Sequence, residues 1–189
     1  MTIYALSSGA GISGVAVIRV SGKNTAEVVK KMTGGELPRP RVATLKKFNK
    51  NGRKDLIDEG VIIWFPAPNS YTGEDLAEFH VHGSRAVIKA MHLTISKIKN
   101  CRLAEPGEFT KRAFQNGRIN LLKAESIVDL ISAETEIQRK QALKIMSGKS
   151  SSGKSIFASM CDKIFKSFSL HKLNLSDDFP LIIFKACFL

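Results

Sequence analysis

The 189-residue sequence contains few cysteines, namely Cys101, Cys161 and Cys187. Their odd number and wide spacing argue against a secreted disulfide framework and favour a reducing compartment, so we expect a cytoplasmic protein. No apolar run approaches the roughly 20 residues that a membrane helix needs, so no membrane partner is expected. The first basic side chain is Arg19, which argues against a secretory or transit leader at this N-terminus.

Acidic residues are also scarce, because 17 Asp and Glu stand against 29 Lys and Arg and leave a formal net charge of +12. Such an excess suits anionic partners such as nucleic acid or polycarboxylates, without choosing between them. The densest basic stretch has no acidic residue and contains Arg39, Arg41, Lys46, Lys47, Lys50, Arg53 and Lys54. It is either a solvated hairpin turn or the phosphate-contacting surface of an RNA-binding module, with tRNA as the candidate partner.

Short apolar segments alternate with helical ones along the first two thirds of the chain. Strands are predicted over residues 3–6, 15–20, 42–48, 57–65 and 76–82, and short helices near 24–34, 87–98 and 108–116. The spacing of Asn24 and Glu27 predicts a capping box, and residues 122–146, nearly free of helix breakers, predict one long helix. Since the connections are too short for all neighbouring strands to be parallel, the predicted fold class is α+β, a mixed β-sheet with flanking helices followed by a long α-helix.

The sequence changes character near residue 147, where serine, glycine and lysine dominate. From Gly148 to Ser155 it satisfies G-x-x-x-x-G-K-S, the phosphate-binding loop of nucleotide hydrolases. A strand should precede such a loop, whereas a helical pattern does here, and residues 156–189 are too few to complete a nucleotide fold. We therefore interpret the string as a helix break.

The predicted strand at 76–82 has a two-residue period that places Glu78, His80 and His82 on one face. This pattern fits three interpretations: a facial metal site, a solvated sheet face, or a carboxylate that lines a ligand pocket. Alternate residues of one strand lie about 6.5 Å apart, which makes convergence on one metal ion difficult. No metal ligands and no catalytic residues are predicted.

Several long motifs occur together in a fixed order: GVAVIRVSG at 14–22, WFP at 64–66, PNSYTGED at 68–75, LAEPGEFTKRAF at 103–114 and LKAESIVDLI at 122–131. In this order they resemble the N-terminal domain of the MnmE (TrmE) family of tRNA-modification GTPases, and the resemblance extends to about residue 148. On this basis the predicted organisation is a folate-binding and dimerisation domain at 1–118, the start of a helical domain at 119–148, and an atypical tail at 149–189.

The resemblance implies an aminomethyltransferase-like fold that binds a one-carbon tetrahydrofolate (5-formyl- or 5,10-methylene-type) and pairs as a homodimer. The family's full-length protein acts with an MnmG-type flavoprotein to modify the wobble uridine of certain tRNAs, and GTP, magnesium and potassium belong to that full-length protein. Its folate contacts correspond to Arg19, Glu78 and Arg118.

Each of these residue types suits a part of folate. A carboxylate such as Glu78 can accept both the amide N–H and the exocyclic amine of a reduced pterin. A guanidinium can pair with the glutamyl carboxylates or cover a polar pterin edge, and the sequence does not assign these tasks between Arg19 and Arg118. Without the resemblance, each arginine would be interpreted as part of a surface ion pair.

The sequence departs from the family pattern at several places. Residues 8–14 (SGAGISG) replace a Pro-Gly-x-Gly-Gly type loop, and Asn120 stands where an aspartate is common. No GTPase domain is recognisable, so GTP hydrolysis by this chain alone is not expected, and a truncated or frame-shifted product is our hypothesis for the tail. Apolar residues Ile127, Leu130, Ile131 and Ile137 would then lack packing partners, which favours self-association. A bare dimerisation module without folate binding is a third alternative.

Overall fold

The computed structural model describes residues 1–9, 11–50 and 55–148, so the G-x-x-x-x-G-K-S string lies outside the described residues from residue 149 onward. Its internal contacts divide the chain into one unit over Met1–Asn120 and another that starts at Leu121. Across the described residues, no helix has the length and apolar character required to span a membrane.

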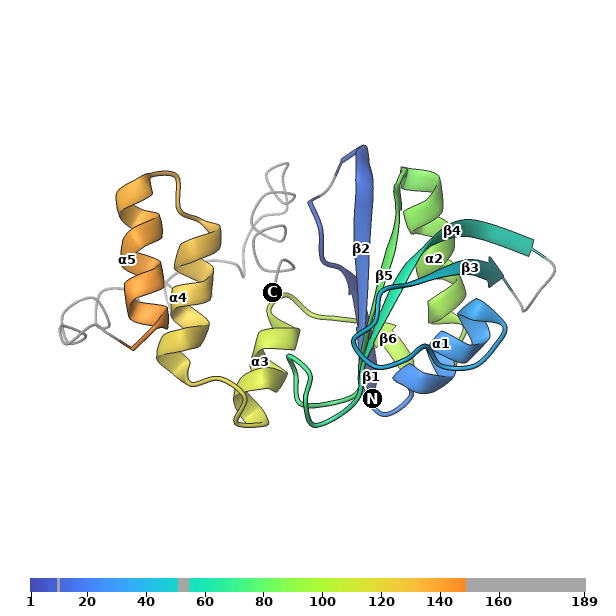
Figure 1. Ribbon diagram of the computed structural model, residues 1–189, viewed down its shortest axis with the longest axis horizontal. Coiled ribbons are helices and arrows are strands. Elements are labelled where there is room, and N and C mark those ends of the chain that lie inside the picture. Colours follow the sequence, from blue (N-terminus) through green and yellow to red (C-terminus); the bar gives the residue numbers. More distant parts are fainter. Residues whose placement is uncertain (10, 51–54, 149–189) are drawn as a thin grey trace, which may run out of the picture. The chain divides into compact units, whose positions relative to one another are not determined.

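A six-stranded sheet forms the frame of the first unit (Figure 1). Its strands are β1 (Thr2–Leu6), β2 (Ser13–Ser21), β3 (Thr44–Lys50), β4 (Asp55–Phe65), β5 (Leu76–Gly83) and β6 (Cys101–Leu103), in the spatial order β3-β4-β5-β2-β1-β6. The β1/β6 pair is parallel and the other four pairs are antiparallel, which confirms the predicted mixed sheet. The three-residue β6 was not predicted, because so short a segment shows no periodicity.

Three helices belong to this unit: α1 (Thr25–Thr33), α2 (Arg85–Ser96) and α3 (Glu108–Gln115). Helix α1 ends at Gly34, whose φ of 65° is the left-handed conformation that glycine adopts without steric cost. The predicted Asn24–Glu27 capping box is wrong, because the Asn24 side chain donates to the Lys99 carbonyl instead of capping α1.

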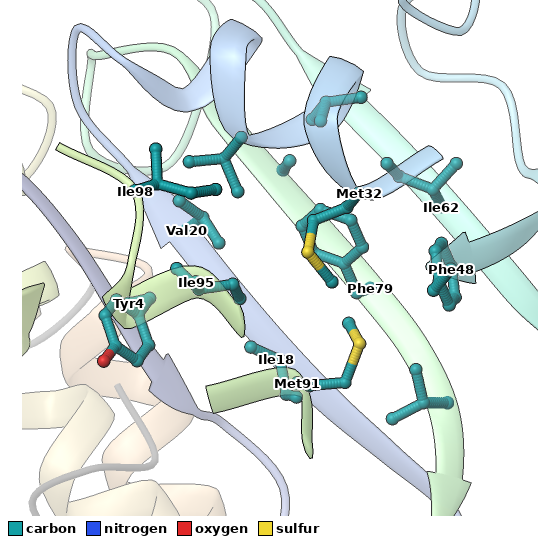
Figure 2. Close-up of a cluster of buried hydrophobic side chains, with 14 of the residues drawn as sticks. Tyr4, Ile18, Val20, Met32, Phe48, Ile62, Phe79, Met91, Ile95 and Ile98 are labelled. Atoms are coloured by element: carbon teal, nitrogen blue, oxygen red, sulfur yellow. The ribbon is translucent and has the colours of Figure 1, made fainter. Parts of the chain in front are cut away.

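Helices α1 and α2 cover one face of the sheet, and the main apolar core lies between them and the strands (Figures 1 and 2). Ile18 of β2 and Phe79 of β5 project into this core and meet Met32 of α1 and Met91 of α2. Since neighbouring residues of a strand point to opposite faces, Glu78 points away from the helices, as the period of 76–82 predicted.

The second unit differs from its prediction, because the single long helix over 122–146 is wrong. Two helices, α4 (Leu121–Ile131) and α5 (Glu136–Met146), pack against each other. Thr135 adopts an extended conformation, its hydroxyl accepts the Gln138 N–H, and the Gln138 side chain accepts the Thr135 N–H. This capping box starts α5 without glycine or proline.

The predicted apolar stripe is divided between the two helices of this unit. Ile131 and Ile137 are 40% and 78% exposed, whereas Ile127 and Leu130 are half-buried. The described part of the second unit therefore leaves apolar surface open to packing.

The sheet tolerates no side chain at Gly60, where a Cβ atom would lie 2.1 Å from the backbone oxygen of His80 on β5. We expect Gly60→Ala to force β4 and β5 apart and to lower the free energy of unfolding by about 1–3 kcal/mol. Gly35→Ala is the matched control, since its Cβ would meet no atom within 4 Å. Urea unfolding measures both variants, and equal midpoints would contradict the close approach of the two strands.

Candidate functional site

An arginine–glutamate pair occupies the sheet face opposite α1 and α2. In the antiparallel register of β2 and β5, Arg19 lies directly across from Glu78. The Arg19 Nε and Nη2 atoms both donate to Glu78 Oε1, at 3.0 and 2.9 Å, and each side chain is 19% exposed. The sheet thus brings together two of the three predicted site residues, which are 59 positions apart in the sequence.

Two aromatic rings enclose the Arg19 guanidinium. The Cζ atom of Arg19 lies 5.5 Å from the ring centre of Tyr71 and 5.6 Å from that of Phe109. Tyr71 comes from the segment between β4 and β5, and Phe109 comes from the first turn of α3. Both distances fall within the roughly 6 Å range of cation–π attraction, so the rings help to hold the guanidinium in place.

Arg118, the third predicted residue, lies just beyond α3 and is exposed. Its backbone N–H donates to the Ala113 carbonyl at 2.8 Å. The Arg118 Cγ and Cδ atoms pack against Gly73, since a Cβ built there would lie 3.2 and 3.3 Å from them. Arg118 therefore borders the same β4–β5 segment that carries Tyr71.

A chain of ion pairs connects the segment between β4 and β5 to α3. The sequence analysis did not predict this chain. Glu108, 8% exposed, accepts from Arg102 Nη2 at 2.6 Å and from Arg112 Nη2 at 3.0 Å, and Arg112 Nη1 donates to Glu74 at 2.8 Å. Burial by itself raises the pKa of Glu108, but hydrogen bonds from Arg102, the Glu105 N–H and Arg112 outweigh it and hold that pKa below its ordinary value. The 108–112 spacing on α3 was the only available signal.

The two histidines of β5 have different surroundings. His82 donates its backbone N–H to Asp58 at 2.8 Å, and its Nδ1 lies 2.8 Å from the other Asp58 oxygen. Burial by itself raises the pKa of Asp58, but the hydrogen bonds from His82 and from the Glu59 N–H have the larger combined effect. The pKa of Asp58 is therefore below its ordinary value. The buried Nε2 of His80 lies 3.7 Å from Glu78 Oε2. Nowhere in the described ranges do three His, Cys, Asp or Glu side chains form a group that could hold a metal ion.

Several basic residues of the stretch at 39–54 have partners where the structure describes them. Lys50 Nζ lies 3.5 Å from Asp55, Lys47 stands opposite Glu59 in the β3/β4 register, and Arg41 donates to the Asn69 carbonyl. Arg53 and Lys54 lie outside the described residues. These pairings are typical of a solvated hairpin.

The geometry defines an α+β domain whose mixed sheet carries an apolar, helix-covered face and an opposite face with a half-buried arginine–glutamate pair. A family model described as "GTP-binding protein TrmE N-terminus" matches residues 2–118. The chain belongs to this family.

Curated relatives agree with this assignment. The chain is 64% identical to the tRNA modification GTPase MnmE of Pelagibacter ubique over 180 residues, which is 95% of this chain and 40% of that protein. It is 50% identical to the mitochondrial 5-taurinomethyluridine-[tRNA] synthase subunit GTPB3 of Danio rerio over 78% of this chain and 29% of that protein. With MnmE of Parvibaculum lavamentivorans it shares 48% identity over 78% of this chain and 34% of that protein. The chain thus spans less than half the length of these relatives.

Replacing Glu108 should show how much the chain of ion pairs contributes to the free energy of unfolding. Since the pKa of Glu108 is lowered on folding, its stabilisation is complete above the ordinary value of 4.5 and is lost as the pH falls through the folded-state value. We expect Glu108→Gln to lower the free energy of unfolding by about 1.5–3 kcal/mol at neutral pH, and by clearly less near pH 3.

Urea unfolding at the two pH values measures this difference. Glu27→Gln is the control, because Glu27 forms an exposed pair with Lys31 at 2.7 Å and should contribute little. A Glu108→Gln effect of equal size at both pH values would show that the ionised carboxylate is not the stabilising group.

Proposed function

We propose that this chain is the folate-binding and self-pairing part of a tRNA wobble-uridine modification GTPase. Family membership and the names of the relatives, which refer to tRNA modification, support the part of the proposal that concerns tRNA modification. The observation that carries the folate assignment is the Arg19–Glu78 pair, held half-buried on the sheet face opposite α1 and α2, with the Tyr71 and Phe109 rings beside the guanidinium. The aminomethyltransferase-like character of the fold is part of the same proposal.

The donor and acceptor groups at this pair fit a reduced pterin. The hydrogen bonds from Arg19 Nε and Nη2 both fall on Glu78 Oε1. The Oε2 atom therefore keeps acceptor capacity for the N–H groups of a pterin edge, and Arg19 compensates the charge of the carboxylate. The exposed Arg118 guanidinium suits the carboxylates of the glutamyl tail.

Within this proposal the residues of this chain bind and orient the cofactor. The folate, 5-formyl- or 5,10-methylene-type, supplies the one-carbon unit when bound. GTP, magnesium and potassium, together with an MnmG-type flavoprotein partner, are assigned to the whole protein, of which this chain spans a part.

Removal of the Glu78 carboxylate tests the cofactor assignment. We expect Glu78→Ala to weaken binding of 5-formyltetrahydrofolate at least about thirtyfold, because the pterin N–H groups lose their charged acceptor and Arg19 its partner. Glu36→Ala removes an exposed carboxylate and should bind as the unaltered chain does. Isothermal calorimetry measures the affinities, and circular dichroism checks that each variant is folded. Equal affinity for Glu78→Ala would remove this residue from the site.

A parallel titration with tRNA separates the alternatives. Folate binding without tRNA binding supports the proposal, and tRNA binding alone, with steep salt dependence, supports a basic RNA-binding module. Binding of neither ligand supports a bare dimerisation module.

Self-pairing is tested by the mass of the chain in solution. The exposed apolar residues of α4 and α5 and the proposed pairing of the first unit predict a dimer at micromolar concentration. Light scattering coupled to size-exclusion chromatography gives the mass directly. A monomer throughout the micromolar range would contradict self-pairing without affecting the folate assignment.

A further inference from the structure

The position of the Arg19 guanidinium decides which Glu78 oxygen is left for a ligand. Its Nε and Nη2 atoms both donate to Oε1, so Oε2, which lies 3.7 Å from His80 Nε2, is the oxygen that receives neither of these hydrogen bonds and keeps acceptor capacity. A rotated guanidinium would distribute its hydrogen bonds differently over the carboxylate. Whatever fixes the guanidinium therefore also fixes the acceptor that Glu78 presents.

Of the two rings beside Arg19, Tyr71 lies in the loop between β4 and β5, and hydrogen bonds hold it in place. Its hydroxyl lies 3.0 Å from the Thr110 hydroxyl on α3. The next residue, Thr72, is fully buried, shares a 2.6 Å hydrogen bond with Ser21 on β2, and accepts the Asn116 side chain on its carbonyl at 2.7 Å. Hydrogen bonds thus attach Tyr71 and Thr72 to β2, to α3 and to Asn116, the residue that follows α3.

An ion pair at Glu74, three residues after Tyr71, also holds this loop. Glu74 accepts from Arg112 at 2.8 Å, and Arg112 is itself only 14% exposed because it also pairs with Glu108. Charge-assisted hydrogen bonds in a half-buried setting are stronger than neutral ones. The segment is therefore fixed to α3 at two points, through the Tyr71 hydroxyl and through the Glu74 carboxylate.

We infer that Tyr71 is a positioning residue of the proposed folate site. Its ring fixes the Arg19 guanidinium against Glu78 Oε1 and thereby keeps Glu78 Oε2 directed to the pterin. The ring face performs this task through cation–π contact, whereas the Thr110 hydrogen bond only helps to hold the ring. The ligand assignment rests on the proposed function, but the positioning of Arg19 does not.

Two variants of Tyr71 separate the ring from its hydroxyl. Tyr71→Phe keeps the ring, and Tyr71→Ala removes it. Phe114→Ala is the matched control, since it removes a 47% exposed ring of α3 and leaves the two rings beside Arg19, Tyr71 and Phe109, in place. The first measurement is the nuclear magnetic resonance signal of the Arg19 Nε–H group without ligand, because its position depends on nearby rings and its exchange rate on the bond to Glu78. The second is the affinity for 5-formyltetrahydrofolate.

Tyr71→Ala should move the Arg19 signal, speed its exchange with solvent and weaken folate binding about tenfold. Tyr71→Phe and Phe114→Ala should keep both properties within about twofold of the unaltered chain. An unmoved and equally protected Arg19 signal in Tyr71→Ala would overturn the inference, as would a loss in Tyr71→Phe equal to that in Tyr71→Ala. If the unaltered chain binds no folate, the proposed function fails, while the Arg19 signal still decides whether Tyr71 positions Arg19.

Discussion

The register between β2 and β5 is the constraint on which the site depends. Ile18 and Val20 of β2 are completely buried against the helices, and so are Ala77 and Phe79 of β5. Because the side-chain period of a strand is two, this apolar alternation places Arg19 and Glu78 together on the opposite face. A slip by one residue would move a charged side chain into the core. The hydrophobic core thus positions the polar site.

The two faces of the sheet are covered by different kinds of interaction. On the α1/α2 side, a large apolar cluster supplies the packing. On the side of α3, the buried apolar cluster is small and consists of Ile3, Ala5, Ala104 and Phe109. The Arg102–Glu108–Arg112–Glu74 chain supplements it, so α3 and the Tyr71 segment are held by charge-assisted hydrogen bonds. These bonds hold the charged groups of this face in a fixed geometry.

The alternation of apolar and polar residues was sufficient to predict the strands and the two faces of β5. The five apolar segments became strands and the Glu78 face was correct, because alternation directly reports which side is buried. The start of α5 and the Asn24 cap were mispredicted, because they depend on side-chain hydrogen bonds of Thr135 and Gln138 and on the bond from the Asn24 side chain to the Lys99 carbonyl. The strand period singled out Glu78 as one of three candidates, whereas its folate role and the choice of Arg19 and Arg118 entered through family resemblance. Tyr71 and Arg112 were not singled out, because no spacing shows which distant residues will meet.

The most direct test of the central claim is a crystal structure of this chain with 5-formyltetrahydrofolate. Our account predicts density for the pterin ring on the sheet face opposite α1 and α2, with its N–H groups at hydrogen-bond distance from Glu78 Oε2 and Arg19 still on Oε1. A pterin bound elsewhere in the chain, with this face solvated, would contradict the account.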